Sequence, residues 1–163
     1  TETKVEPVVL KIENLYFEKS ACFGKCPQYN ALIMPDGRVK VHGIANTILL
    51  GTRVLKFKPY VIDSIMSGLK AVNFFELDSI YDNKYVTDIP ETSLTVTSNL
   101  GEKRVMSRYD APKNLIYYYK YIHSEIELLL EAESIIVKER KKNMPIATEK
   151  DVNPIPKGSD YKK

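Results

Sequence analysis

The residues of this chain best suited to metal or redox chemistry are two cysteines and two histidines. Cys22 and Cys26 are the only cysteines and lie four positions apart in SACFGKCPQYN, and the two histidines, His42 and His123, follow later in the chain. Two thiolates with either histidine as a third ligand would supply the soft donors that select Cu(I). The same pair could instead form a disulfide, or two buried free thiols.

The segment after the cysteine pair weakens the metal interpretation. C-F-G-K-C-P resembles the CxxxCP motif of Sco-type copper chaperones, in which the motif opens a helix whose N-terminus lowers the thiol pKa. Here it precedes QYNALIM, which has the pattern of a strand. A zinc site would need four ligands, commonly two pairs, and this chain offers one pair. We therefore expect no metal and no cofactor.

A role in shaping a loop is the favoured interpretation of the pair. Gly24 is expected to permit a turn that a side chain would resist, and Pro27 to fix the entry into the next strand. A bridge across so short a loop would stabilise the fold by only about 2 kcal/mol and would need an oxidising compartment.

Hydrophobic periodicity predicts the elements that position this loop. Strands are expected over residues 8–17, 28–34, 38–43 and 52–57, with a bulge near Asn14 and a hairpin turn at Asp36-Gly37. A helix opens at Pro59, and a second hairpin over 93–109 turns at Gly101. The fold class is therefore α+β, with two layers: an antiparallel sheet of five to six strands and two main helices.

The last helix carries an apolar seam that indicates where it packs. Asp110 is expected to cap this helix, which ends near Lys142, and only one of Tyr118 and Tyr119 is expected to join the core. Residues 73–91 lack periodicity and predict an ordered loop anchored by Phe74, Phe75 and Tyr81.

Length and charge limit the domain count and the partners. The chain of 163 residues predicts one domain over 8–142, with an N-terminal extension over 1–7 and an extended arm over 143–163. The net charge of +3 comes from residues 138–163, which carry eight Lys/Arg against four Asp/Glu. Basic charge in a tail rather than on a folded face does not favour nucleic-acid binding. The sequence has no long apolar run, so no integral membrane segment is predicted.

Carboxylates gather in the aperiodic loop, where paired acids could hydrolyse glycosides or bind Ca²⁺. The residues are Glu76, Asp78, Asp82, Asp88 and Glu91, and they do not follow the D-x-D-x-D-G calcium pattern. Asp88, just before Ile89-Pro90, is expected to turn the chain by bonding nearby backbone N–H groups. We assign no catalytic residue and favour a protein that is not an enzyme.

Several motifs together resemble the uncharacterised bacterial family DUF6438. They are the C-F-G-x-C-P-x-Y start, the D-G hairpin and a T-D-x-P segment, within residues 8–126. The matching positions are Cys22, Phe23, Gly24, Cys26, Pro27, Tyr29, Asp36, Gly37, Thr87, Asp88 and Pro90. The resemblance implies a small domain of bacterial, often exported, proteins and no particular reaction.

These observations predict a non-catalytic binding or interaction domain of the bacterial cell envelope, whose partner is a protein or small ligand there. The alternative is a thiol-based copper or redox protein. The candidate binding loop comprises Phe23, Gly24, Lys25, Pro27, Tyr81, Asp82, Thr87, Asp88 and Pro90. An exported location is expected, periplasmic or lipid-anchored, with the leader absent from the sequence. A cytoplasmic location is the alternative.

Overall fold

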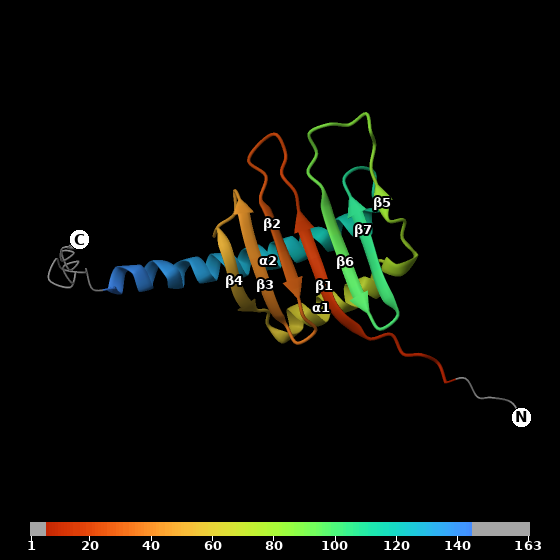
Figure 1. Cartoon of the computed structure of the whole chain (residues 1–163), viewed down its shortest axis with the longest axis horizontal. Coiled ribbons are helices and arrows are strands. Elements are labelled where there is room, and N and C mark those ends of the chain that lie inside the picture. The colour runs from red at the N-terminus through yellow and green to blue at the C-terminus, as the bar shows by residue number, and fades with distance from the viewer. Residues whose placement is uncertain (1–5, 145–163) are drawn as a thin grey trace, which may run out of the picture.

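The computed structural model describes residues 6–144, which form one seven-stranded sheet with two helices behind it (Figure 1). The strands are β1 (Ile12–Lys19), β2 (Gln28–Ile33), β3 (Arg38–Ala45), β4 (Gly51–Lys56), β5 (Ile80–Tyr81), β6 (Thr92–Ser98) and β7 (Gly101–Ser107). The helices are α1 (Pro59–Ala71), the short 3-10 helix η1 (Phe74–Glu76) and α2 (Lys113–Asn143). The α+β class is thus confirmed, with more strands than predicted.

The strands lie in the order β4-β3-β2-β1-β6-β7-β5. Neighbours are antiparallel except β5, which pairs parallel with β7, so the sheet is mixed rather than antiparallel. The sequence missed β5 because two paired residues within the 73–91 segment are too few to show a period. Of the three expected anchors there, Phe74 is fully buried and Tyr81 half-buried, but Phe75 is exposed.

The pairing of β1 with β6 joins the two halves of the sheet. The ladder runs from Ile12 opposite Ser98 to Lys19 opposite Thr92, and its register shifts between Ile12 and Asn14, where a bulge was predicted. The expected strand start at Val8 was wrong: Val8 and Leu10 are exposed and precede β1. Strand β6 ends at Ser98, so residues before Ile12 have no ladder to extend.

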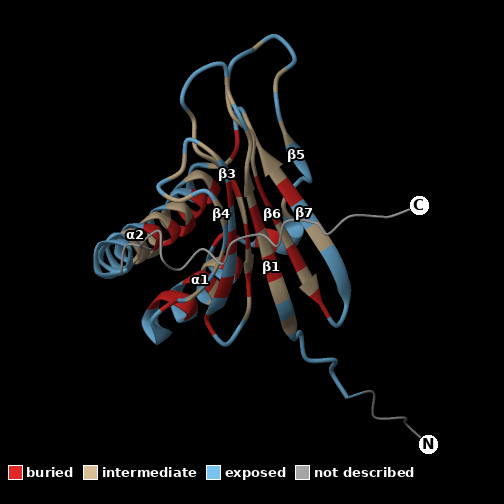
Figure 2. Cartoon of the chain, turned by 60° about the vertical axis from the view of Figure 1, so that its left-hand side comes forward, coloured by how far each residue is buried: buried red, intermediate tan, exposed pale blue. Residues whose placement is uncertain are grey.

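Both helices cover one face of the sheet, and the core lies between the layers (Figure 2). Tyr118 and Tyr119 are both in this core, where one tyrosine was expected. Each hydroxyl reaches a backbone acceptor: Tyr118 donates to the Ile65 carbonyl oxygen at 2.6 Å and Tyr119 to the Val105 carbonyl oxygen at 2.7 Å. Because both polar ends are satisfied, both rings can be buried without an unpaired hydroxyl.

Helix α2 begins and ends close to the predicted limits, but without the predicted cap. Pro112 occupies the N-cap position, no side chain caps the helix, and Asp110 has a left-handed φ of 58°. The helix crosses the sheet and continues past β4 (Figure 1). Apart from its first two residues, the predicted arm over 143–163 lies outside the described residues. No helix within 6–144 has the length and apolarity needed to cross a membrane.

The two helices approach each other closely at Gly68. A Cβ placed there would lie 2.3 Å from Cε2 of Tyr118, whose ring is buried and whose hydroxyl is tied to α1. Elsewhere in a helix, replacing glycine with alanine stabilises by about 1 kcal/mol. Here the clash should outweigh that gain, because displacing a packed ring costs about 1–3 kcal/mol.

We predict that Gly68→Ala lowers the free energy of unfolding by about 1 kcal/mol in urea denaturation, the clash outweighing the gain in helix propensity. The neighbouring Ser67 is exposed, so Ser67→Ala serves as the control and should stay within about 0.5 kcal/mol of the wild type. A Gly68→Ala protein as stable as the wild type would show that the Tyr118 ring can move aside.

Candidate functional site

Two loops rise side by side from one end of the sheet (Figure 1). Residues 20–27 connect β1 to β2, and residues 82–91 connect β5 to β6. They are neighbours because Lys19, which ends β1, pairs with Thr92, which begins β6. We call these two segments the paired loops.

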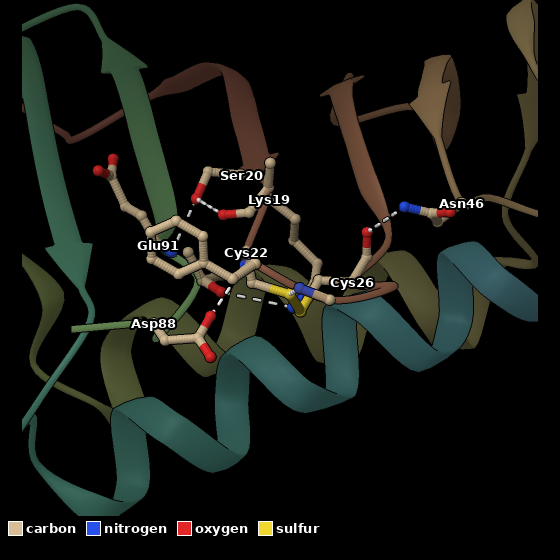
Figure 3. The surroundings of a disulfide bond; sticks show 11 residues. Lys19, Ser20, Cys22, Cys26, Asn46, Asp88 and Glu91 are labelled. Atoms are coloured by element: carbon tan, nitrogen blue, oxygen red, sulfur yellow. Dashed lines mark hydrogen bonds between the residues drawn. A yellow bond between two sulfur atoms is a disulfide. The ribbon is translucent and has the colours of Figure 1, made fainter.

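The first of the paired loops is closed by a disulfide between Cys22 and Cys26 (Figure 3). The Cα atoms of the two cysteines are 5.7 Å apart, and the Gly24 N–H donates to Cys22 Sγ at 3.3 Å. From the β3–β4 connection, Asn46 Nδ2 donates to the Cys26 carbonyl oxygen at 3.3 Å. The loop is therefore held both internally and by a neighbouring turn.

Gly24 does not have the role that the sequence predicted. Its φ is not in the left-handed region, and a Cβ there would contact only Cys22 Sγ, at an ordinary 3.8 Å. The disulfide and Pro27, rather than a special glycine conformation, restrict the loop.

Asp88 couples the second loop to the first (Figure 3). Its Oδ1 accepts the Phe23 N–H at 2.9 Å, across 65 residues, and its own φ of 66° is left-handed. The expectation that Asp88 bonds nearby backbone was wrong, because its acceptor oxygen serves the other loop. Sequence periodicity carries no signal for such a contact between two aperiodic segments.

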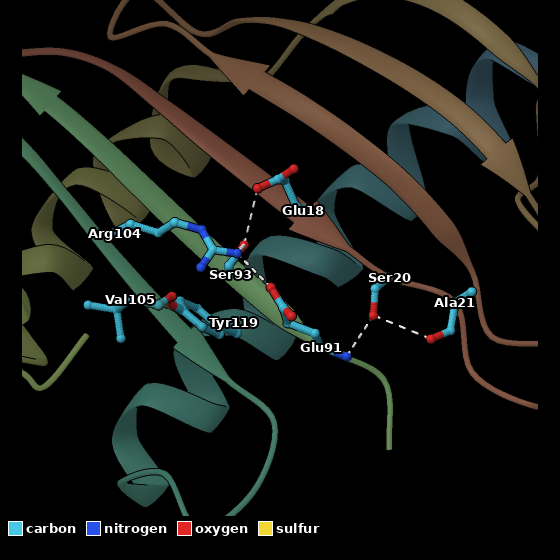
Figure 4. Close-up of polar contacts among 8 residues, drawn as sticks. All are labelled: Glu18, Ser20, Ala21, Glu91, Ser93, Arg104, Val105 and Tyr119. Carbon is cyan, nitrogen blue, oxygen red and sulfur yellow. Dashed lines mark hydrogen bonds and ion pairs between the residues drawn. The ribbon is translucent and has the colours of Figure 1, made fainter. Parts of the chain in front are cut away.

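Two further hydrogen bonds join the bases of the paired loops. The Ser20 N–H donates to the Glu91 carbonyl oxygen at 2.9 Å, and the Glu91 N–H donates to Ser20 Oγ at 2.8 Å. The Glu91 carboxylate also binds Arg104 on β7 at 2.6 Å (Figure 4). Arg104 reaches the Ser93 hydroxyl at 3.1 Å, and that hydroxyl donates to Glu18 at 3.3 Å.

Arg108, which the sequence patterns did not single out, holds the second loop at two points. Its guanidinium donates to the Val86 carbonyl oxygen, and its Nε lies 3.5 Å from Asp82 Oδ1. Tyr81 lies beneath the loop rather than on its exposed surface: it is half-buried in β5, and its hydroxyl accepts the Asp78 N–H at 3.1 Å.

The tips of the paired loops expose two aromatic rings. Phe23 is 87% exposed and Tyr85 is 82% exposed. Lys84 Nζ lies 5.0 Å from the centre of the Tyr85 ring, and Lys25 and Thr87 are exposed beside them. Tyr85 is not among the residues that the sequence predicted for the candidate binding loop.

The two histidines contact residues other than the cysteines. His42 is on the uncovered face of the sheet, where its Nδ1 is 2.8 Å from the Thr52 hydroxyl. His123 on α2 has its Nδ1 2.7 Å from the Tyr29 hydroxyl and its Nε2 3.4 Å from Glu127. Within residues 6–144, no group of three or more His, Cys, Asp or Glu side chains is arranged to hold a metal ion.

His123 is neutral at physiological pH. Burial, together with the smaller effect of the nearby Lys19 ammonium, lowers its pKa to about 4. The Tyr29 ring stacks on the imidazole, with 5.7 Å between the ring centres. Burial also raises the pKa of Tyr29 far above its usual value, so its hydroxyl keeps its proton.

A family model described as Domain of unknown function (DUF6438) matches residues 13–126 of this chain. The matched range includes both paired loops and the first half of α2. It confirms the family resemblance carried by the C-F-G-x-C-P, D-G and T-D-x-P motifs. No curated protein matches the chain.

We predict that Asp88→Gly increases the hydrogen-exchange rate of the Phe23 amide at least tenfold, because the substitution keeps the left-handed backbone and removes the acceptor. NMR detection of that amide measures the effect. Asp88→Asn is the control, since its Oδ1 can still accept and asparagine tolerates this φ. Unchanged exchange in Asp88→Gly would mean that the loops are held without this contact.

We also predict how the free energy of unfolding depends on pH. The unfolded His123 binds a proton near pH 6.5 and the folded one only near pH 4, so the unfolded state gains protons first as the pH falls. Stability should therefore decline from pH 6.5 to 4, with roughly 2 kcal/mol due to His123. His123→Gln should remove that part of the decline in urea unfolding at successive pH values. Equal pH profiles would contradict the burial of a neutral imidazole.

Proposed function

The chain belongs to the DUF6438 family, and we propose that it is a non-catalytic binding domain whose paired loops contact a protein partner in the bacterial cell envelope. The observation that carries the proposal is the coupling of the two loops. Hydrogen bonds join segments 65 residues apart, while the tips beyond them expose Phe23 and Tyr85.

Coupled loops favour binding because they are ordered before a partner arrives. Ordering a side chain or loop at an interface costs free energy, and a preformed surface avoids much of that cost. The disulfide, the Asp88 contact and the Arg108 contact each restrict one part of the surface. Exposed aromatic rings contribute a large contact area with few rotatable bonds, which is why they are common at interfaces.

A protein partner fits this surface better than a small ligand does. Two pockets of the described residues reach this end of the sheet, with volumes of about 140 and 180 Å³. Small-molecule sites usually span about 300–1,000 Å³ and enclose most of the ligand. Phe23 and Tyr85 instead project from the loop tips, where they can insert into a partner.

The engagement of the loop carboxylates supports a non-catalytic role. Asp82 contacts Arg108, Asp88 accepts a backbone N–H, and Glu91 binds Arg104. Three of the five acids considered for catalysis thus have a structural partner. Acids that position loops in this way carry no indication of acid–base chemistry.

The Cys22–Cys26 disulfide supports an exported location, periplasmic or lipid-anchored at the envelope, because such bonds persist in oxidising compartments. The same bond makes the thiol-based copper or redox function the less favoured alternative. A bridged pair has no thiolate to bind metal, and the strand β2 after Pro27 provides no helix N-terminus to activate a thiol.

A photocrosslinking amino acid at position 85 tests the proposal in the cell envelope of the source bacterium. We expect a discrete crosslinked protein, whose yield falls at least tenfold when Phe23→Ala is added, because truncating an aromatic anchor typically costs about 2 kcal/mol. The same crosslinker at position 60 is the control. Tyr60 is also exposed, at 62%, but lies at the start of α1.

Equal crosslinking from positions 85 and 60, or a yield from position 85 that Phe23→Ala leaves unchanged, would contradict the proposal. Circular dichroism of the purified Phe23→Ala protein checks that it is folded. Because Phe23 is exposed, we expect its stability to change by less than about 0.5 kcal/mol.

A further inference from the structure

We propose that a small pocket at the root of the paired loops, on the helix-covered side of the sheet, binds an oxyanion through Lys19 and Lys120. The ligand is a carboxylate or a phosphate group. This inference goes beyond the contact made by the loop tips and does not depend on it.

Three strand ends and one helix form this pocket. Lys19 ends β1, Thr92 begins β6 and Ser107 ends β7, so all three lie at the end of the sheet that carries the paired loops. Helix α2 closes the other side with Ile116, Tyr119, Lys120 and His123. The volume is about 140 Å³, the space of four to five water molecules at ~30 Å³ each, which admits one carboxylate or phosphate group.

The pocket holds positive charge without a matching carboxylate. Within residues 6–144, no carboxylate oxygen lies within 4.0 Å of the Lys19 or Lys120 amine. Lys19 Nζ is 3.5 Å from the Thr92 hydroxyl, and burial lowers the pKa of this amine. A partly desolvated ammonium with a single weak partner gains more from an incoming anion than a fully hydrated one does.

The acid whose charge acts on Lys19 does not fill this role. Glu127 acts on Lys19 at longer range, but its carboxylate contacts His123 Nε2 at 3.4 Å and does not line the pocket. The buried Tyr29 hydroxyl needs an acceptor, which assigns the acceptor role to His123 Nδ1 and leaves the Nε2 hydrogen facing Glu127. The imidazole therefore lines the pocket without donating a hydrogen bond to a ligand. The donors that remain are the amines of Lys19 and Lys120 and the hydroxyls of Thr92 and Ser107.

The donor set also defines what the pocket excludes. Two ammonium groups repel a cation, and the hydroxyls would be left unpaired beside an apolar group. Lys120 is exposed, with its amine 5.9 Å from the centre of the Tyr117 ring, so it can swing toward an anion. The oxygens of an oxyanion can accept from ammonium and hydroxyl donors alike.

Titration with sodium phosphate at constant ionic strength, followed by NMR of the two imidazoles, tests the inference. His123 lines the pocket and His42 lies on the opposite face of the sheet, so His42 is an internal reference. We expect the His123 signals to shift and saturate while those of His42 stay fixed. Lys19→Met and Lys120→Gln should each weaken binding at least tenfold, since each removes a charge-assisted hydrogen bond.

Lys40→Met, on the uncovered face, is the matched control and should bind phosphate as the wild type does. Lys120→Gln keeps the test valid if Lys19→Met fails to fold. A parallel titration with sodium acetate separates the sources: saturation by phosphate alone supports a phosphate group, and saturation by acetate supports a carboxylate. No saturable shift with either anion, or equal binding by Lys120→Gln, would overturn the inference and leave the crosslinking result unaffected.

Discussion

The pairing of β1 with β6 is the contact on which the rest of this structure depends. It joins the β1–β4 meander to the β6–β7 hairpin, and its register places Leu15 opposite Val96 and Phe17 opposite Leu94 on the helix-covered face. A shift of one residue would turn these side chains to the other face of the sheet. The burial of the core therefore fixes this register strongly.

The same register determines where the loops meet. Lys19 is the last residue of β1 and lies opposite Thr92, the first residue of β6. The loop that follows β1 and the loop that precedes β6 therefore start side by side. The hydrogen bonds from Ser20 and Phe23 then bind the second loop to the first. The β1–β6 pairing thus sets the position of both the exposed aromatic tips and the pocket below them.

Around this end of the sheet, polar groups lie on both sides of β1. Glu18 faces the open side and joins Ser93, Arg104 and Glu91, while Lys19 faces the helices near His123. Alternation along a strand separates adjacent side chains in this way. One short segment thereby anchors the loops from the open face and supplies a cation to the covered face.

The sequence by itself determined the α+β class, both main helices and most strands, because alternation at two residues and recurrence at 3.6 residues are local properties. It also located the cysteine loop and Asp88 as features to examine, through motifs that are local too. Only the tertiary structure decided that Asp88 serves Phe23, that both Tyr118 and Tyr119 are buried, and that β5 pairs in parallel. Each of these depends on a hydrogen-bond partner distant in the chain, which no local pattern encodes.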